Sequence, residues 1–298
     1  MNNLLVMLLV GFAAQLVDGS LGMAYGVTST TLLLSTGMAP AVASASVHLA
    51  EVGTTLASGL SHWRFGNVDW RTVRMVAVPG AVGAFLGAVA LSSLSTEAAK
   101  PWVAGLLLAL GFYILTRFSF GRAPKPRGRS YVRHRYLAGL GLVAGFVDAS
   151  GGGGWGPIAT PTLIATGKME PRKVIGSVDT SEFIVSVAAS LGFLGGMGLA
   201  GFDLRVVGVL LLGGLLAAPL AAWLVRHLRP RILGCTVGGL IILTNGRTIL
   251  NALDVAGGAR AAIYVVIAAL WSVATIVTVR SMRNDKDRAE DEVVATAL

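Results

Sequence analysis

Long apolar runs recur along the chain, and short polar segments separate them. A run of about 20 apolar residues is long enough to cross the hydrocarbon core of a bilayer as a helix. The alternation over about ten residues that is typical of a membrane β-barrel is absent. The pattern therefore predicts an all-α integral membrane protein with about seven full transmembrane helices. The expected spans are residues 40–62, 73–94, 102–115, 174–197, 204–225, 232–250 and 261–279.

Two stretches of the sequence occur twice. VDGSLGMAYG, which contains Asp18, returns as VDASGGGGWG with Asp148, 130 residues later. SASVHLAE (44–51) returns as IGSVDTSE (175–182), 131 residues later. The second match pairs His48 with Asp179 and Glu51 with Glu182. These echoes predict two repeated halves, residues 1–118 and 136–253.

The charges predict how the halves lie in the membrane. The linking segment 119–135 carries several arginines and no acid, which indicates a cytoplasmic loop. We count membrane crossings outward from this loop in both directions. By this count, segments 4–36 and 136–167 each start and end on the same side of the membrane, and the two segments enter from opposite faces. Each divides into two short pieces, so we expect two re-entrant or broken helical hairpins in an inverted-topology repeat, with a substrate site near the midplane. The short pieces are 4–17 and 26–36, then 137–148 and 156–166; tilted spans are the alternative.

The rest of the chain lies outside the repeat. Residues 254–280 are expected to form an extra C-terminal transmembrane helix, and 281–298 a disordered cytoplasmic tail. The single cysteine, Cys235, permits no internal disulfide, and no Cys/His spacing typical of zinc is present. We therefore predict no metal site and no other cofactor.

Composition agrees with a membrane protein. Of 298 residues, 54% are hydrophobic and 13% are charged, which is too apolar for a soluble globule. The net charge of +9 fits membrane topology better than nucleic-acid binding, because no stacking pattern or binding fold accompanies the basic residues. When tail and loop acids are set aside, all the remaining acids stand at repeat-matched positions: Asp18, Glu51, Asp148, Asp179 and Glu182. Acids inside a membrane are costly and indicate function.

The glycine-rich stretches predict an anion site. Each precedes the start of a short helix, and helix N-termini offer unpaired N–H donors and a positive dipole end. The alternatives are that the glycines serve close packing and that the two aspartates cap these helices, in which case aspartate and anion would compete. The expected binding residues are Gly19, Ser20, Gly22, Tyr25, Gly26 and Thr28, with Ser150, Gly152, Gly153, Gly154, Trp155 and Gly156.

A polar stripe on segment 40–62 predicts proton transfer. Ser44, His48, Glu51 and Thr55 follow helical spacing on one face, so this face meets protein or water rather than lipid. Histidine and buried carboxylates are suitable proton carriers. The expected proton-coupling residues are Asp18, His48, Glu51, Asp148, Asp179 and Glu182. A hydrogen-bond network between helices is the alternative.

At these motifs, together with GLSHWRFGNVD, the chain resembles the TauE/SafE sulfite exporter family over residues 4–250. The resemblance implies a proton-coupled secondary transporter that exports sulfite, an organosulfonate or a related small sulfur-containing anion across the bacterial inner membrane. The partners would be that anion, protons and the lipid bilayer, with the C-terminus cytoplasmic and the oligomeric state open. A Na⁺ or divalent-cation transporter using the buried carboxylates is the alternative, and an intramembrane hydrolase using Ser20 is disfavoured for want of a partner base.

Overall fold

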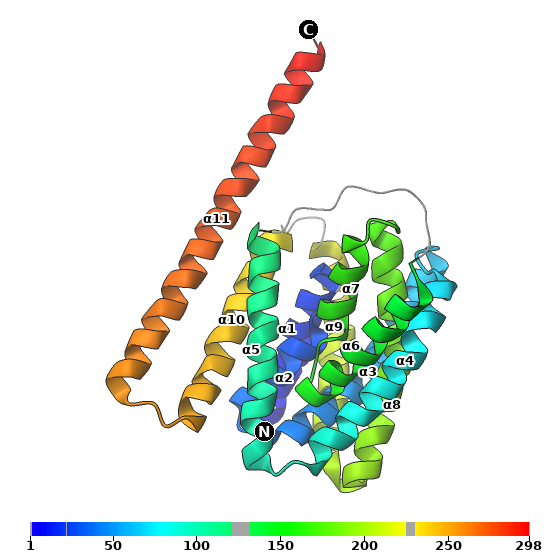
Figure 1. The fold of residues 1–298 in the computed structure, drawn as a ribbon, viewed down its shortest axis with the longest axis vertical. Helices are drawn as coiled ribbons and strands as arrows, with labels where there is room; N and C mark the ends of the chain where they lie inside the picture. The colour runs from blue at the N-terminus through cyan, green and yellow to red at the C-terminus, as the bar shows by residue number, and fades with distance from the viewer. Residues whose placement is uncertain (1, 22, 121–131, 225–229, 298) are drawn as a thin grey trace.

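The computed structural model describes residues 2–21, 23–120, 132–224 and 230–297, and the regular elements of these ranges are all helical (Figure 1). The first half contains α1 (Asn2–Leu21), α2 (Tyr25–Ser35), α3 (Pro40–Arg64), α4 (Trp70–Ser93) and α5 (Thr96–Phe120). The second half contains α6 (His134–Gly151), α7 (Trp155–Ala165), α8 (Pro171–Met197), a 3₁₀ turn η1 (Leu199–Gly201), α9 (Leu204–Leu224) and α10 (Pro230–Ala252), before α11 (Gly257–Ala297). The all-α prediction is thus confirmed for the described residues.

The paired helices α1–α2 and α6–α7 correspond to the predicted hairpins, but their first arms are longer than expected. α1 has 20 residues and α6 has 18, which at 1.5 Å per residue makes them about 30 and 27 Å long. The predicted half-bilayer pieces 4–17 and 137–148 are therefore corrected. Each helix continues past its aspartate, and α6 ends at Gly151, followed by the C-cap residue Gly152, whose φ of 74° is left-handed. The second arms, α2 and α7, have 11 residues each and keep the predicted half-bilayer length.

Helices predicted to be repeat equivalents run in opposite directions. Between α3 and α8, Gly59 lies against Thr180, whereas Glu51 accepts a hydrogen bond from Ser186. Residue numbers along this contact rise on one helix as they fall on the other, so the two helices are antiparallel. α5 and α10 pack in the same antiparallel way, as these contacts show: Gly111 with Ile241, Leu115 with Gly238, and Phe118 with Gly234. An inverted repeat requires such opposed directions, and the inverted membrane topology stays a prediction.

Glycines allow the backbones of α4 and α6 to touch. A Cβ on Gly145 would lie 2.1 Å from the carbonyl oxygen of Gly80, and one on Gly83 would lie 2.1 Å from that of Leu142. Small residues let membrane helices approach closely, since van der Waals packing drives their association. The same device joins α1 to α9, where a Cβ on Gly11 would meet the carbonyl oxygen of Leu210 at 2.4 Å. The long first arms are thereby fixed to the rest of the bundle.

We expect Gly145→Ala to destabilise the protein, because the added methyl group overlaps the α4 backbone. Overpacking of this kind costs about 1–3 kcal/mol. Gly139→Ala on the same helix is the matched control, because a Cβ there meets nothing within 4 Å. Thermal unfolding of the two purified variants in detergent should show a lower Tm for Gly145→Ala only. Equal Tm values for the two variants would contradict this account of the contact between α4 and α6.

Four helices of the described ranges are long and apolar enough to cross a membrane, namely 70–93, 96–120, 172–197 and 257–282. The total of about seven spans stays a prediction. α11 stands at the edge of the bundle beside α10, and its C-terminal part extends beyond the end of the bundle (Figure 1). It exposes Val265, Val266 and Val273, which suits contact with lipid. Its backbone is helical to Ala297, whereas the sequence predicts disorder for 281–298.

Candidate functional site

Asp18 and Asp148 perform the same task in the two halves. The Oδ1 atom of Asp18 accepts a hydrogen bond from the backbone N–H of Tyr25 at 3.2 Å. The Oδ1 atom of Asp148 accepts one from the N–H of Trp155 at 2.9 Å. Each aspartate therefore reaches across its glycine-rich turn and caps the first turn of α2 or α7. The sequence analysis assigned the backbone N–H groups at the start of these helices to an anion. In each half, one of these N–H groups is instead bonded to an aspartate carboxylate.

The two glycine-rich turns cross backbone to backbone. A Cβ on Gly153 would lie 2.2 Å from the nitrogen of Val27, and one on Gly26 would lie 2.9 Å from the Cα of Gly153. The hydroxyl of Thr30 donates to the carbonyl oxygen of Gly152 and ties the turns together. The glycines therefore serve close packing, which was the alternative left open above. We call this contact of Gly26 with Gly153 the tip crossing.

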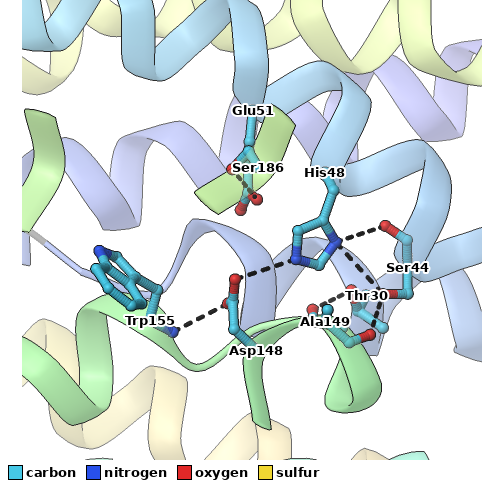
Figure 2. Close-up of polar contacts among 9 residues, drawn as sticks. Thr30, Ser44, His48, Glu51, Asp148, Ala149, Trp155 and Ser186 are labelled. Carbon is cyan, nitrogen blue, oxygen red and sulfur yellow. Dashed lines mark hydrogen bonds and ion pairs between the residues drawn. The ribbon is translucent and has the colours of Figure 1, made fainter. Parts of the chain in front are cut away.

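His48 links α3 to the second half (Figure 2). Its Nδ1 atom lies 2.8 Å from the carbonyl oxygen of Ser44, and its Nε2 atom lies 3.1 Å from Oδ2 of Asp148. A carbonyl oxygen only accepts, so Nδ1 carries a hydrogen. A second proton must then lie between Nε2 and Oδ2, on either the ring or the carboxyl group, and the pair has no net charge. Both side chains are buried, and the Ser44 hydroxyl extends the link by donating to the carbonyl oxygen of Ala149 at 2.8 Å.

The repeat-matched counterpart of this pair is built from acids of both halves. Repeat matching puts Asp179 where His48 stands and Asp18 where Asp148 stands, and both line a narrow cavity with Glu51 and Glu182. Its volume is about 10 Å³, room for about one water molecule. None of the described residues that line it is basic; the others are Gln15, Tyr25, Thr54, Thr55 and Ser58. We call it the acid cavity.

Glu51 connects the acid cavity to the tip crossing. Its Oε2 atom accepts a hydrogen bond from the Ser186 hydroxyl at 3.3 Å (Figure 2). A Cβ built on Gly26 would lie 2.9 Å from its Oε1 atom, so the carboxyl group stands directly over the start of α2. Within the described part of the chain, this buried Oε1 and the Oδ2 atom of Asp179 have no hydrogen-bond partner. Polar atoms buried in this way are free to take a proton or a ligand.

Some of the other residues predicted to bind the anion pack between helices, and others lie near the tip crossing. Trp155 is fully buried, donates from Nε1 to the carbonyl oxygen of Val178 at 3.1 Å and packs its ring against Gly80, so it supports the helices rather than facing a ligand. The Tyr25 hydroxyl donates to the carbonyl oxygen of Leu210 at 3.4 Å. Thr28 and Ser150 are buried, with hydroxyls that have no partner among the described residues.

The other predicted binding glycines lie at the turns themselves. Gly154 stands immediately before α7, and Gly156 faces Met23, since a Cβ there would lie 3.0 Å from the Cβ of Met23. Gly19 and Ser20 belong to the last turn of α1, and the surroundings of their side-chain positions lie outside what is described. Gly22 lies outside the described residues.

Sequence reasoning missed several polar residues near the site. Gln15 lines the acid cavity, and Thr30 binds the opposite turn. The side chain of Asn245 is buried on α10 and donates to the Thr31 hydroxyl at 3.0 Å. An amide in an otherwise apolar span was the signal that could have found Asn245. Thr30 had no such signal, because threonine hydroxyls in membrane helices commonly bond to their own helix.

Comparison with known proteins places these features in a family. A family model described as "Sulfite exporter TauE/SafE" matches residues 7–248. The probable membrane transporter protein YtnM of Bacillus subtilis (strain 168) is 49% identical over 285 residues, which cover 95% of each chain. A probable membrane transporter protein of Haemophilus influenzae is 26% identical over 252 residues, covering 85% of this chain and 90% of the relative. No solved structure matches the chain significantly.

Proposed function

The chain belongs to the sulfite exporter TauE/SafE family and is a multi-pass membrane transporter rather than an enzyme; we propose that it carries a small sulfur-containing anion together with protons. Sulfite or an organosulfonate is the expected substrate, following the family's name. The membrane is the bacterial inner membrane, with the C-terminus cytoplasmic. Movement of one half against the other would expose the central site to each side in turn.

The acid cavity is the observation that carries this proposal. Asp18 holds the N–H of Tyr25 at the start of α2, where an anion would find its donors. Three further acids face the same space: Glu51, Asp179 and Glu182. The cavity must widen before an anion can enter, because it has room for about one water molecule. Entry also requires that protons neutralise the carboxylates, because like charges at close range repel strongly. Anion and protons would therefore bind together, and the gradients of both would set the direction of transport.

The His48–Asp148 pair and the acid cavity would have different tasks in this cycle. The His48–Asp148 pair already holds its protons and is satisfied by hydrogen bonds on both sides. We assign it the role of an anchor that keeps α3 and the α6–α7 turn together. The acid cavity has no basic residue in its described lining. Its acids, which come from both halves, would gain and lose the coupled protons: Asp18, Glu51, Asp179 and Glu182. In this proposal, the site with His48 has a structural role, and the matching site with Asp179 couples protons to transport.

The experiment is sulfite flux into proteoliposomes measured across a range of pH. We expect flux to rise as the pH falls. In Glu51→Gln and Glu182→Gln the flux should persist but vary less with pH, because one carboxyl group is permanently neutral. Asp254→Asn, in an exposed loop, is the matched control and should keep the wild-type profile. An unchanged pH profile in both glutamine variants would assign these acids a purely structural role.

A cation transporter is the second candidate, because the same four carboxylates could hold Na⁺ or a divalent cation instead of protons. It predicts Na⁺ uptake that does not depend on sulfite. Flux of radioactive Na⁺ into the same proteoliposomes, with and without sulfite, separates the two functions. Sulfite-independent Na⁺ uptake with no sulfite flux would replace our proposal.

A further inference from the structure

A second, larger cavity of about 530 Å³ opens where the end of α2, the start of α5 and the end of α10 meet. Its polar lining comes from Glu97, Lys100, Thr248 and Asn251. The sequence analysis assigned nothing to this place. Lys100 is exposed, and it is the one basic residue among the described residues of the lining.

This cavity and the acid cavity lie at opposite ends of α2. Tyr25, the first residue of α2, lines the acid cavity, and Leu34, near its end, lines the larger one. At 1.5 Å per residue the two ends are about 16 Å apart. The tip crossing stands at the Tyr25 end, between the acid cavity and the rest of α2. By the predicted topology the acid cavity continues toward the cytoplasm through Ser58, and the larger cavity faces outside.

Uncharged polar groups run along α2 between the two ends. Asn245 on α10 donates to the Thr31 hydroxyl, and its Oδ1 atom is buried without a partner among the described residues. One turn nearer the crossing, the buried Thr28 hydroxyl also has none. Hydroxyl and amide groups can donate to an anion without holding it as tightly as a fixed cation would. Glu97, which is exposed, is the one acid among the described residues that line the larger cavity.

We propose that the larger cavity is an outer vestibule for the transported anion, in which Lys100 concentrates small oxoanions before they pass along the polar face of α2 to the tip crossing. The vestibule rests on the proposed function, because it needs an anion as substrate. At the 131-residue offset Lys100 matches Arg231, whose guanidinium donates to the carbonyl oxygens of Phe118 and Ser119, whereas Lys100 is exposed at a cavity. The charge of the two linings differs: the described lining of the vestibule carries one acid, Glu97, and one base, Lys100, whereas that of the acid cavity carries four acids and no base.

The first test replaces Lys100 and measures sulfite flux from the outer side of oriented proteoliposomes. Lys100→Gln should raise the KM for sulfite about threefold or more at low salt, with less effect at high ionic strength and no change in maximal rate. Lys100→Arg keeps the charge and should behave as wild type. Arg205→Gln is the control, since Arg205 is an exposed cation on the same predicted face that does not line the cavity. Equal KM values for Lys100→Gln and wild type would overturn the proposal.

The second test maps access with a single cysteine. Thr248→Cys is made in a Cys235→Ser background and treated in intact cells with a methanethiosulfonate reagent that carries a sulfonate. Labelling should occur from outside, and ethanesulfonate should slow it several-fold, whereas Ser58→Cys should be labelled only from the cytoplasmic side. Absent labelling or absent protection at residue 248, in a protein that transports anions normally, would refute the vestibule. Failure of the proposed function would give a different result, because the wild-type protein itself would then show no anion flux.

Discussion

Gly153→Ala should abolish anion transport. The φ of Gly153 is 149°, a conformation that a residue with a side chain rarely adopts, and the new Cβ would lie 2.2 Å from the backbone nitrogen of Val27. The strain alone costs about 1–3 kcal/mol, and the overlap with backbone adds to it. Because the obstruction lies at the tip crossing, the two half-helices must move apart. Sulfite flux in proteoliposomes should fall more than about tenfold, which corresponds to 1.4 kcal/mol.

Two companion variants make this result specific. Gly26→Ala approaches the crossing from the other half and stays within an α-helix, so it keeps a normal φ and should lose less activity. Gly105→Ala on α5 adds a Cβ that meets nothing within 4 Å and should transport as wild type. Size-exclusion chromatography and thermal unfolding show whether each variant is folded. A folded Gly153→Ala protein with normal flux would remove the tip crossing from the transport path.

The sequence could predict the charged centre because the repeat marks it. Asp18 and Asp148 cap α2 and α7 in the same way, and matched glycines lie where the chain must turn. The local pattern contained this information, because a capping acid and a glycine-rich turn act over few residues. It also supplied the two possible tasks of the aspartates: the structure shows the capping contact, and competition with an anion for the same donor stays a prediction.

The contacts between elements could not be predicted in this way. His48 was matched to Asp179 by the repeat, but its hydrogen-bond partner is Asp148, a contact that depends on how α3 packs against α6. The lengths of α1 and α6 were underestimated because an aspartate and a glycine read as helix breakers, although tertiary packing carries both helices further. The larger cavity at Lys100 arises from three helix ends that are far apart in sequence.

Variants of Asp148 and Asp18 distinguish most sharply between an aspartate that anchors the helices and one that carries a proton. Asp148→Ala should lose both stability and transport, because the buried His48 ring and the N–H of Trp155 would be left without their partner. Breaking a buried pair of this kind costs about 3–5 kcal/mol. Asp148→Asn should instead retain most of the flux and the wild-type pH profile. Its oxygen can accept from Trp155 and its NH₂ group can donate to Nε2 of His48, which reproduces the net charge of zero that the native pair already has.

Asp18→Asn should behave in the opposite way. Asp18 faces three other acids and no described cation, so it is one of the four acids whose charge would change when an anion enters the acid cavity. A permanently neutral side chain at this position should leave the protein folded and flatten the rise of sulfite flux with falling pH. The comparison is made on pH profiles and unfolding midpoints of Asp18→Asn and Asp148→Asn measured side by side. If Asp148→Asn flattened the profile and Asp18→Asn did not, the proton would move on the His48–Asp148 pair, and the roles of this pair and of the acid cavity would have to be exchanged.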